Sequence, residues 1–354
     1  MSHTITRVLV TGNLGYVGSV LTPALRARGY VVTGYDTGYY AGFPPLGAMD
    51  GTYPDRQIMK DVRDIERADL DGVDAVVHLA ALSNDPLGAL RPGVTERINY
   101  GGTMRVAELA KASGVRRFVY ASSQSMYGVA DTTSEVEEDA SAKNPVTAYA
   151  RTKWEAEQAL VTLEGHGFEP VFLRPSTVFG PSPRLRCDIV YNNLVASGFT
   201  TGTITVLSDG TPWRPVVHVN DVCDVFLAAL VAPASIVSAQ AFNVGIKGGN
   251  YTVRDLAEAA RASVPGCTLE IAGAPSPDER TYRVSFKKLH DRLAGYGVPS
   301  RTLEDGGRGL VALFVATGFA ETDFRGARCT RLMALNAQLS SGALDDELRW
   351  TARE

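Results

Sequence analysis

Tyr149 and Lys153, in the segment NPVTAYARTKW, are the residues of this chain whose types and spacing most directly offer chemistry. Side chains four residues apart lie on one face of a helix, so the ammonium group can sit beside the phenol. A neighbouring cation favours the phenolate, and we expect it to lower the pKa of Tyr149 below the value of about 10 for a free tyrosine. The pair would then act as a proton shuttle. The same spacing also occurs on solvated helix surfaces, so the neighbouring motifs must decide whether this pair is catalytic.

A glycine-rich turn, TGNLGYVG, runs from Thr11 to Gly18. It joins a predicted strand at residues 7–10 to a helical pattern of apolar residues that starts at Val17 and is closed by Gly29. At a strand–turn–helix junction such glycines let a pyrophosphate approach the backbone and the helix N-terminus, so the turn predicts dinucleotide binding. The spacing G-x-x-G-x-x-G alone would also fit a flexible turn. Beside the tyrosine–lysine pair, it predicts hydride transfer with a nicotinamide cofactor.

The next predicted strand, residues 30–35, ends at Asp36. A carboxylate at this strand tip can accept hydrogen bonds from the adenosine ribose and would repel a 2′-phosphate, which favours NAD over NADP. An aspartate in the glycine-rich turn TGYYAG is the plainer alternative. A third predicted strand, residues 74–79, runs into the small pair Ala80 and Ala81, which lets backbone pass near a cofactor. His78 in this strand is expected to be a core histidine.

Further elements continue the alternation of strands and helices over the first 180 residues. Residues 94–112 predict a helix and residues 116–121 a strand, which would place Ser123 at a carboxyl strand end. Asn144 and Pro145 are expected to cap the helix that carries Tyr149. The alternation predicts an α/β fold with a doubly wound parallel sheet, and such sheets bind ligands at the carboxyl ends of their strands.

The composition is that of a soluble globular protein of one large or two medium domains. The chain has 354 residues, 45% of them hydrophobic, and a net charge of −4 with scattered basic residues, which argues against nucleic acid or an acidic membrane as partner. No charged-then-apolar leader is present and no apolar run approaches the roughly 18 residues of a membrane span, so we expect a cytoplasmic protein. The four cysteines show no metal-ligand spacing and are expected to be reduced; they are Cys187, Cys223, Cys267 and Cys329.

Ten motifs in order along residues 5–290 resemble the extended short-chain dehydrogenase/reductases, specifically the NAD-dependent nucleotide-sugar epimerase/dehydratase family. They are TGNLGYVG, the Asp36 strand tip, Asp61-Val62, HLAA (78–81), Asn99, SSQSMYG, YARTK, LRPSTVFGP (173–181), GTPWRPVVHVNDV (210–222) and FNVG (242–245). The resemblance implies an NAD cofactor and a nucleotide-diphosphate-sugar substrate. It also implies a homodimer formed through the helices near Thr103 and Tyr149.

The resemblance implies roles for the matching positions. Ser123 would bind the sugar hydroxyl or carbonyl oxygen, Tyr149 would be the acid/base, and Lys153 would hold the nicotinamide ribose. The implied cofactor-binding positions are Gly12, Asn13, Leu14, Gly15, Tyr16, Val17, Asp36, Asp61, Val62, Leu79, Ala80, Ala81, Asn99, Tyr149, Lys153 and Val178, with Asn99 holding the framework. The implied substrate-binding positions are Ser83, Ser125, Asn193, Arg214 and Arg280, where the guanidinium forks suit a diphosphate. Without the family pattern, Asn99 could also be an ordinary polar residue of a helix, and Arg214 could be an ordinary charged residue on the surface.

Two departures from the family pattern bear on the reaction. Sugar 4,6-dehydratases of the family carry an Asp-Glu pair where this chain has Gln124 and Ser125, so dehydration is disfavoured. The tail from Gly297 onward has no counterpart in the family pattern, and the helical spacing of Leu332, Leu335 and Leu339 favours packing over chemistry.

The sequence therefore predicts two lobes. The NAD-binding Rossmann domain is expected at residues 1–180 plus 215–246, including the strand near 216–219 and the FNVG strand. A smaller α/β lobe, residues 181–214 and 247–354, would bind the nucleotide sugar. The predicted activity is an NAD-dependent epimerase that removes a hydride and returns it. The alternatives are an NAD(P)H-dependent reductase of a 4-keto sugar and a non-catalytic NAD(P) sensor.

Overall fold

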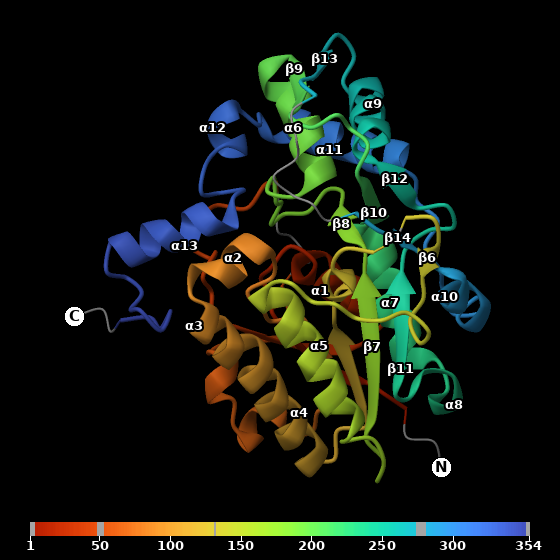
Figure 1. Cartoon of the computed structure of the whole chain (residues 1–354). Coiled ribbons are helices and arrows are strands. Elements are labelled where there is room, and N and C mark those ends of the chain that lie inside the picture. The colour runs from red at the N-terminus through yellow and green to blue at the C-terminus, as the bar shows by residue number, and fades with distance from the viewer. Residues whose placement is uncertain (1–3, 48–52, 131, 274–280, 352–354) are drawn as a thin grey trace.

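In the computed structural model, which describes residues 4–47, 53–130, 132–273 and 281–351, a seven-stranded sheet forms the larger half of the molecule (Figure 1). Its order is β11-β7-β5-β4-β1-β2-β3, and all neighbouring strands run parallel. The central strands are buried on both faces, as apolar parallel strands must be. The strands are β1 (Arg7–Thr11), β2 (Val31–Asp36), β3 (Arg56–Met59), β4 (Ala75–His78), β5 (Arg117–Ala121), β7 (Glu169–Pro175) and β11 (Gln240–Val244).

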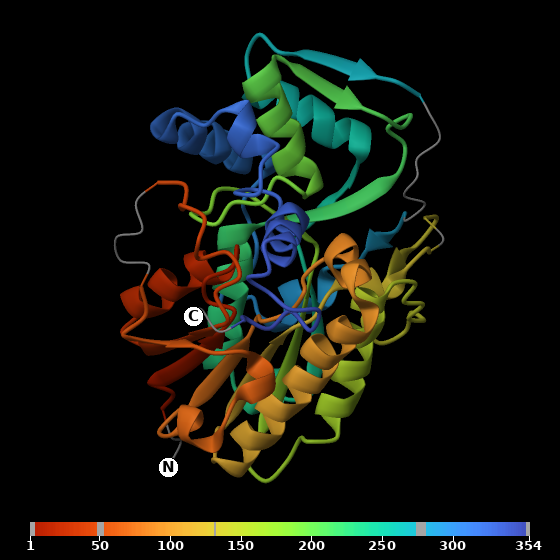
Figure 2. The same ribbon diagram turned by 90° about the vertical axis from the view of Figure 1, so that its left-hand side faces the viewer.

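Helices cover both faces of this sheet, as two views at right angles show (Figures 1 and 2). On one face, Leu21 and Phe226 join Val10 of the sheet in a single buried cluster. On the other face, Ala156 packs with Leu9 in a second cluster. The first face is covered by α1 (Gly18–Ala27), α7 (Val219–Val231) and α10 (Lys287–Arg292), and the second by α4 (Thr103–Ala112) and α5 (Ala148–Val161). The doubly wound α/β architecture predicted from the sequence is confirmed.

The strand order reverses beside β1, which lies between β2 and β4. Chain connections leave the sheet in opposite directions at this point, and a crevice opens at the carboxyl ends of the strands. The glycine turn follows β1, Asp36 ends β2, and the Ala80–Ala81 pair follows β4. The fold therefore brings three motifs from separate parts of the sequence to one edge.

A smaller lobe lies above this edge and has its own apolar core (Figure 2). It contains a three-stranded sheet, β12-β10-β8, and a two-stranded sheet, β13-β9. The strands are β8 (Thr177–Phe179), β9 (Thr203–Val206), β10 (Trp213–His218), β12 (Asn250–Thr252) and β13 (Thr268–Ile271). The helices are α6 (Val190–Thr201), α9 (Val253–Ser263), α11 (Leu303–Thr317) and α12 (Glu321–Phe324). A further short pair, β6 (Glu135–Val136) and β14 (Arg283–Val284), and the helix α8 (Ala234–Val237) complete the connections.

Two expectations about the lobes are wrong. The strand near residues 216–219 was expected in the large sheet, but β10 pairs with β8 and β12. Val217 of this strand and the helix that follows it, α7, still pack into the core of the large sheet. Helix α10 was expected in the smaller lobe, but Leu289 and Leu293 are buried in the core of the large sheet. In both cases tertiary packing decides which surface covers the element.

Several element boundaries also differ from expectation. The short strand β3 was not predicted, because its residues are largely exposed and show no apolar pattern. The helix carrying Tyr149 is capped by Thr147, whose hydroxyl accepts from the Ala150 amide at 3.1 Å, and not by Asn144. The helix expected at 94–112 is present but interrupted: α2 (Asp85–Leu90) and α3 (Pro92–Glu96) lead into a π-helical segment (Arg97–Gly102) before α4.

The C-terminal segment returns from the smaller lobe to the large sheet (Figure 1). Helix α13 (Arg331–Ser340) buries Leu335, and the chain beyond it buries Leu344 and Leu348 in the cluster that also holds Leu9. The predicted helix with a packing role is confirmed. In the described residues, no helix is both long enough and apolar enough to cross a membrane.

Candidate active site

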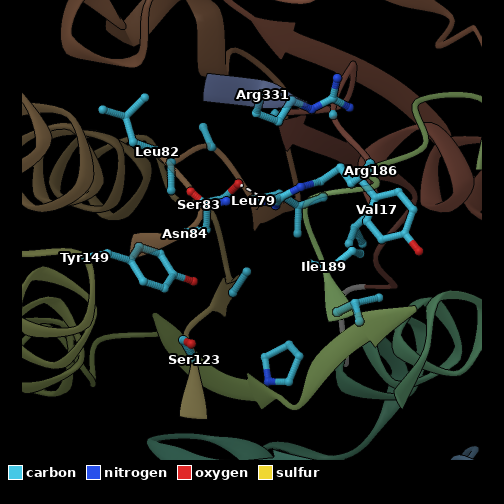
Figure 3. A pocket seen from close by; sticks show the side chains of 18 of the residues that line it. Val17, Leu79, Leu82, Ser83, Asn84, Ser123, Tyr149, Arg186, Ile189 and Arg331 are labelled. Atoms are coloured by element: carbon cyan, nitrogen blue, oxygen red, sulfur yellow. Dashed lines mark hydrogen bonds between the residues drawn. The ribbon is translucent and has the colours of Figure 1, made fainter. Parts of the chain in front are cut away.

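A cavity of about 480 Å³ lies between the two lobes at the carboxyl edge of the large sheet. Seventeen positions expected in the site line it: Gly12, Gly15, Tyr16, Val17, Asp36, Asp61, Val62, Leu79, Ala80, Ala81, Ser83, Ser123, Ser125, Tyr149, Lys153, Val178 and Arg214. Figure 3 shows Tyr149 and Ser123 directed into this space, with Arg186 reaching into it from another side. The structure thus brings together residues spread over most of the chain.

The glycine turn lies so close to β4 that side chains are excluded from it. Gly12 has a positive φ of 72°, and a Cβ atom at this position would lie 2.8 Å from the Ala80 amide nitrogen. A Cβ atom at Gly18 would lie 2.4 Å from the Gly12 carbonyl oxygen. Only glycine fits at these two positions. Because glycine has no side chain, the first turn of α1 stays open to a ligand, as pyrophosphate binding at a helix N-terminus requires.

Asp36 is fixed at the tip of β2. Its carboxylate accepts hydrogen bonds from the amides of Leu14 at 3.0 Å and Gly38 at 2.8 Å. Burial raises the pKa of this carboxyl group, while the two amide hydrogen bonds lower it. The negative charge therefore lines the cavity in a fixed position, where it can accept from ribose hydroxyls and would repel a 2′-phosphate.

Asp61 and Val62, two of the expected cofactor-binding positions, line the same cavity. Val62 is buried, and Asp61 caps a short 3₁₀ turn by accepting from the Arg63 amide at 2.8 Å. Arg63 also closes a bidentate ion pair with the same carboxylate. Tyr39 and Tyr40, which the sequence analysis did not single out, line this end of the cavity. An adenine can lie against these flat side chains.

The three expected catalytic residues converge on the opposite end. Ser123 follows β5 closely and caps the 3₁₀ turn after it, where its hydroxyl accepts from the Ser125 amide at 3.1 Å. Tyr149 is 8% exposed, and Ser123 lies close enough to it to influence the pKa of its phenol. Lys153 is buried, donates to the Ala121 carbonyl oxygen at 2.7 Å, and lies 6.0 Å from the centre of the Tyr149 ring.

The pKa values differ from the expectation that Lys153 lowers that of Tyr149. Burial raises the pKa of Tyr149 to about 12, against the opposing effects of the nearby Ser123 hydroxyl and the charge of Arg186. Burial also lowers the pKa of Lys153 to about 7, although Glu157 acts to raise it. Desolvation is the largest influence on both groups, and it disfavours both charged forms. The positive charge of an oxidised nicotinamide is the further cation that would favour a phenolate at Tyr149.

Three expected cofactor positions support the cavity without lining it. The Asn99 side chain accepts from the Leu82 amide at 2.9 Å and donates to the Leu82 carbonyl oxygen at 3.2 Å, so it holds the loop after β4. Asn13 donates to Gln57 at 2.7 Å. Leu14 takes part through its backbone, which donates to Asp36. His78, expected in the core, is fully buried between the hydroxyls of Thr11 and Thr103.

The expected substrate positions divide into three groups. Ser83, Ser125 and Arg214 line the cavity. Asn193 does not, because it lies on the exposed side of α6, where it donates to the Cys187 carbonyl oxygen at 2.9 Å. Arg280 lies outside the described residues.

Two cavity arginines were not predicted. Arg186 closes a bidentate ion pair with Asp188 and donates to the Ser83 hydroxyl at 3.1 Å. Arg331, from α13, is 3% exposed and also lines the cavity. Arg186 could have been found from the sequence, because it follows shortly after the Gly-Pro that ends the LRPSTVFGP motif. No sequence signal pointed to Arg331, because the tail matched no family motif.

Gln124 shows how the dehydratase positions are used in this chain. Its side chain is 1% exposed, donates to the Arg174 carbonyl oxygen at 3.0 Å and accepts from the Ser176 hydroxyl at 3.1 Å. The amide is therefore engaged in holding β7 and β8. A neutral, fully engaged amide offers neither the acid nor the base that a water elimination needs.

The residues present fit a dinucleotide. The glycine turn leaves room for a diphosphate, Asp36 can receive the adenosine ribose, and Lys153 can receive the nicotinamide ribose beside Tyr149. Bound NAD supplies a hydride acceptor and donor. The described residues contain no group of three or more His, Cys, Asp or Glu side chains placed to hold a metal ion.

Comparisons with known proteins agree with this geometry. Residues 8–245 match the model of the NAD dependent epimerase/dehydratase family. A UDP-glucose 4-epimerase of Mycolicibacterium smegmatis is 30% identical over 285 residues, which are 77% of this chain and 85% of that protein.

Two solved structures are similar over most of their length. TunA, an NAD-dependent NDP-hexosamine 5,6-dehydratase of tunicamycin biosynthesis, is 26% identical with a TM-score of 0.76, over 89% of this chain and 99% of that one. MoeE5, solved with UDP-glucose and NAD, is 26% identical with a TM-score of 0.73, over 88% and 99%. The chain belongs to the NAD-dependent epimerase/dehydratase family of enzymes.

Proposed function

We propose that this protein is an NAD-dependent epimerase of a nucleotide-diphosphate sugar, which oxidises a sugar carbon and reduces it again from the other face. One observation carries the proposal: Ser123, Tyr149 and Lys153 converge in a cofactor cavity in which the acid/base pair of the dehydratases is replaced by Gln124 and Ser125. Oxidation and re-reduction is the simplest chemistry that this set supports. The similarity of this chain to a UDP-glucose 4-epimerase also supports the proposed epimerase activity.

In the proposed mechanism, each of the three residues acts both when the sugar carbon is oxidised and when it is reduced again. The Tyr149 oxygen would take the proton of the reacting sugar hydroxyl, and bound NAD would supply the hydride acceptor and donor. Ser123, which lines the same cavity near Tyr149, would hold the same sugar oxygen. Lys153 would hold the nicotinamide ribose beside the phenol. After the sugar turns, Tyr149 would return the proton to the same oxygen.

The nucleotide sugar is proposed to lie across the cavity from the cofactor turn. Val178 would border the nicotinamide carboxamide, and Ser83 and Ser125 would contact the sugar. Arg214, which lies in β10 of the smaller lobe, would meet the substrate diphosphate. The substrate would thus bridge the two lobes.

The stoichiometry of NAD tests the proposal. The purified protein with catalytic NAD should convert one of a panel of UDP-, dTDP-, GDP- and CDP-sugars over many turnovers, with no net absorbance change at 340 nm. Chromatography would identify the product. Product that forms only in step with consumed NAD(P)H would instead establish a 4-keto-sugar reductase.

We also propose that the enzyme is a cytoplasmic homodimer formed through α4 and α5, which lie side by side on one face of the sheet (Figure 1). Val161 near the end of α5 is 46% exposed, as a residue at an interface would be in one subunit alone. Light scattering on the purified protein should give twice the chain mass, and Val161→Glu should lower it toward a monomer. A wild-type protein of one chain mass would contradict the dimer.

A further inference from the structure

Arg331 stands apart from the other buried arginines of the described chain. Four of the described arginines are at most 7% exposed: Arg117, Arg174, Arg186 and Arg331. Three of these form ion pairs with Glu169, Glu157 and Asp188, respectively. Among the described residues, Arg331 has no such ion pair. A buried cation without a counter-ion is costly, and such groups usually have an anionic partner.

The contacts of Arg331 hold its guanidinium group without neutralising it. One nitrogen donates to the Arg184 carbonyl oxygen at 2.7 Å, and the group lies 4.2 Å from the centre of the Tyr40 ring. A carbonyl oxygen and an aromatic face orient a cation but do not cancel its charge. The remaining donors of the fork stay available to a bidentate anion.

The position of Arg331 indicates which anion would complete the site. It lines the same cavity as Gly15 and Val17, and its charge acts on Asp36 as well as on Arg186. Arg331 therefore lies near the carboxylate of Asp36, which would face the adenosine ribose and which accepts from the Leu14 amide of the glycine turn. In a bound dinucleotide, the group that follows the adenosine ribose is the diphosphate. Three arginines, Arg184, Arg186 and Arg331, act on two carboxylates here, Asp36 and Asp188, so the cations outnumber the carboxylates at this corner.

We propose that Arg331 binds the diphosphate of NAD from the side of the C-terminal helix, with Arg186 as a second contact. The tail thereby completes a cofactor site whose other wall is the glycine turn. The inference rests on the NAD cofactor and is independent of which sugar is converted. A cofactor held from two sides would also stay bound while its hydride is removed and returned, as the proposed function requires.

Binding of cofactor fragments to the apoprotein tests this role separately from turnover. Calorimetry would compare NAD, ADP and adenosine on wild type and on Arg331→Gln. Loss of a charge-assisted bidentate contact should weaken NAD and ADP about 10- to 100-fold and leave adenosine unchanged, since adenosine has no diphosphate. Arg331→Lys keeps the charge but loses the two-pronged guanidinium group, so its affinities for NAD and ADP should lie between those of wild type and Arg331→Gln.

Arg325→Gln is the matched control. Arg325 lies in the same tail, is 62% exposed and pairs with Glu321 on the surface. This variant should bind all three ligands as wild type does. The apoprotein of Arg331→Gln should also unfold at no lower temperature than wild type, because the change removes an uncompensated buried charge. Should that variant fail to fold, Arg331→Lys carries the comparison of ADP with adenosine.

Three results would overturn the proposal. Wild-type affinity of Arg331→Gln for NAD and ADP would show that Arg331 does not meet the diphosphate. Equal weakening of adenosine and ADP would show that Arg331 acts only through packing. Wild-type affinity for NAD combined with weakened binding of a nucleotide sugar would assign the guanidinium group to the substrate. Failure of every nucleotide sugar to react, with these binding results intact, would reject the epimerase and leave the proposal standing.

Discussion

At the scale of single residues, the site depends on burial as much as on charge. Tyr149 and Lys153 both lie in the cavity wall, where desolvation raises the pKa of the phenol to about 12 and lowers that of the amine to about 7. Both groups are therefore largely neutral around pH 8 in the protein alone. A cofactor that brings a positive charge to this corner changes that balance, which links proton transfer at Tyr149 to NAD binding.

Tyr149→Phe tests the proton shuttle directly. The variant should bind NAD with wild-type affinity, because the ring is kept, and should lose about 10²- to 10⁴-fold in turnover, the usual contribution of a positioned acid/base. Binding and turnover are measured on the same preparation. Turnover close to wild type would remove Tyr149 from the mechanism.

Lys153 predicts a pH dependence of stability in the apoprotein. Its folded pKa, about 7, lies below its usual value of 10.5, so between these pH values the unfolded chain binds more protons at this site. The contribution of Lys153 therefore makes the protein more stable as pH rises through this window, by at most about 1.4 kcal/mol per pH unit. Urea unfolding at pH 7.5 and pH 9 measures the difference.

Lys153→Met should reduce this rise in stability, whereas Lys247→Met, on the surface, should leave it as in wild type. Other groups titrate in the same range, so the comparison between the two variants carries the test. If both variants show the wild-type rise, Lys153 is not the buried group responsible.

At the scale of elements, the C-terminal segment is held by the loop after β2. The Tyr39 hydroxyl donates to the Leu348 carbonyl oxygen at 2.6 Å, and the Trp350 indole donates to the Thr37 carbonyl oxygen at 2.6 Å. Leu348 is 1% exposed and has a positive φ of 53°, which is unfavourable for leucine. Burial of its side chain must offset that strain, so the segment is packed with specificity against the cofactor half.

Leu348→Ala should lower the free energy of unfolding by about 2–5 kcal/mol, as for other buried leucines. Met333→Ala is the control on the same tail, because Met333 is 46% exposed and should change stability by less than about 0.5 kcal/mol. Denaturant unfolding of the three proteins gives both values. Equal stability of the two variants would mean that the tail does not contribute to the core.

The π-helical segment is a second element with a clear task. It carries Asn99, whose amide holds both backbone groups of Leu82 in the loop after β4. A π turn inserted between α3 and α4 changes the direction in which side chains leave the helix. An uninterrupted α-helix, as expected from the sequence, would have turned Asn99 differently.

At the scale of the whole molecule, the cavity joins both lobes and the tail, so ligand binding should stabilise the protein as a unit. A saturating ligand at 100 times its Kd adds about 2.7 kcal/mol to the free energy of unfolding. NAD should therefore raise the unfolding temperature more than an equal concentration of NADP, because Asp36 repels the 2′-phosphate. Thermal unfolding with each cofactor measures this difference. Asp36→Asn should reduce the difference between the unfolding temperatures measured with NAD and with NADP. An equal or larger shift with NADP would show that Asp36 does not select the cofactor.

The sequence by itself determined the features that depend on local pattern. The glycine turn between a strand and a helix, the carboxylate at the end of β2, and the four-residue spacing of Tyr149 and Lys153 are each read within one or two elements. The alternation of strands and helices then requires a parallel sheet, and the carboxyl ends of parallel strands share one edge. These constraints sufficed to bring most of the expected cofactor positions to one cavity.

Only the tertiary structure decided which distant surfaces meet. It turned Asn192 inward and Asn193 outward on α6, moved β10 out of the large sheet, and brought Arg331 of the tail to the cavity. It also reversed the expected shift in the pKa of Tyr149. These outcomes depend on how much solvent each group loses when all elements pack together, and neither residue spacing nor local apolar pattern records that quantity.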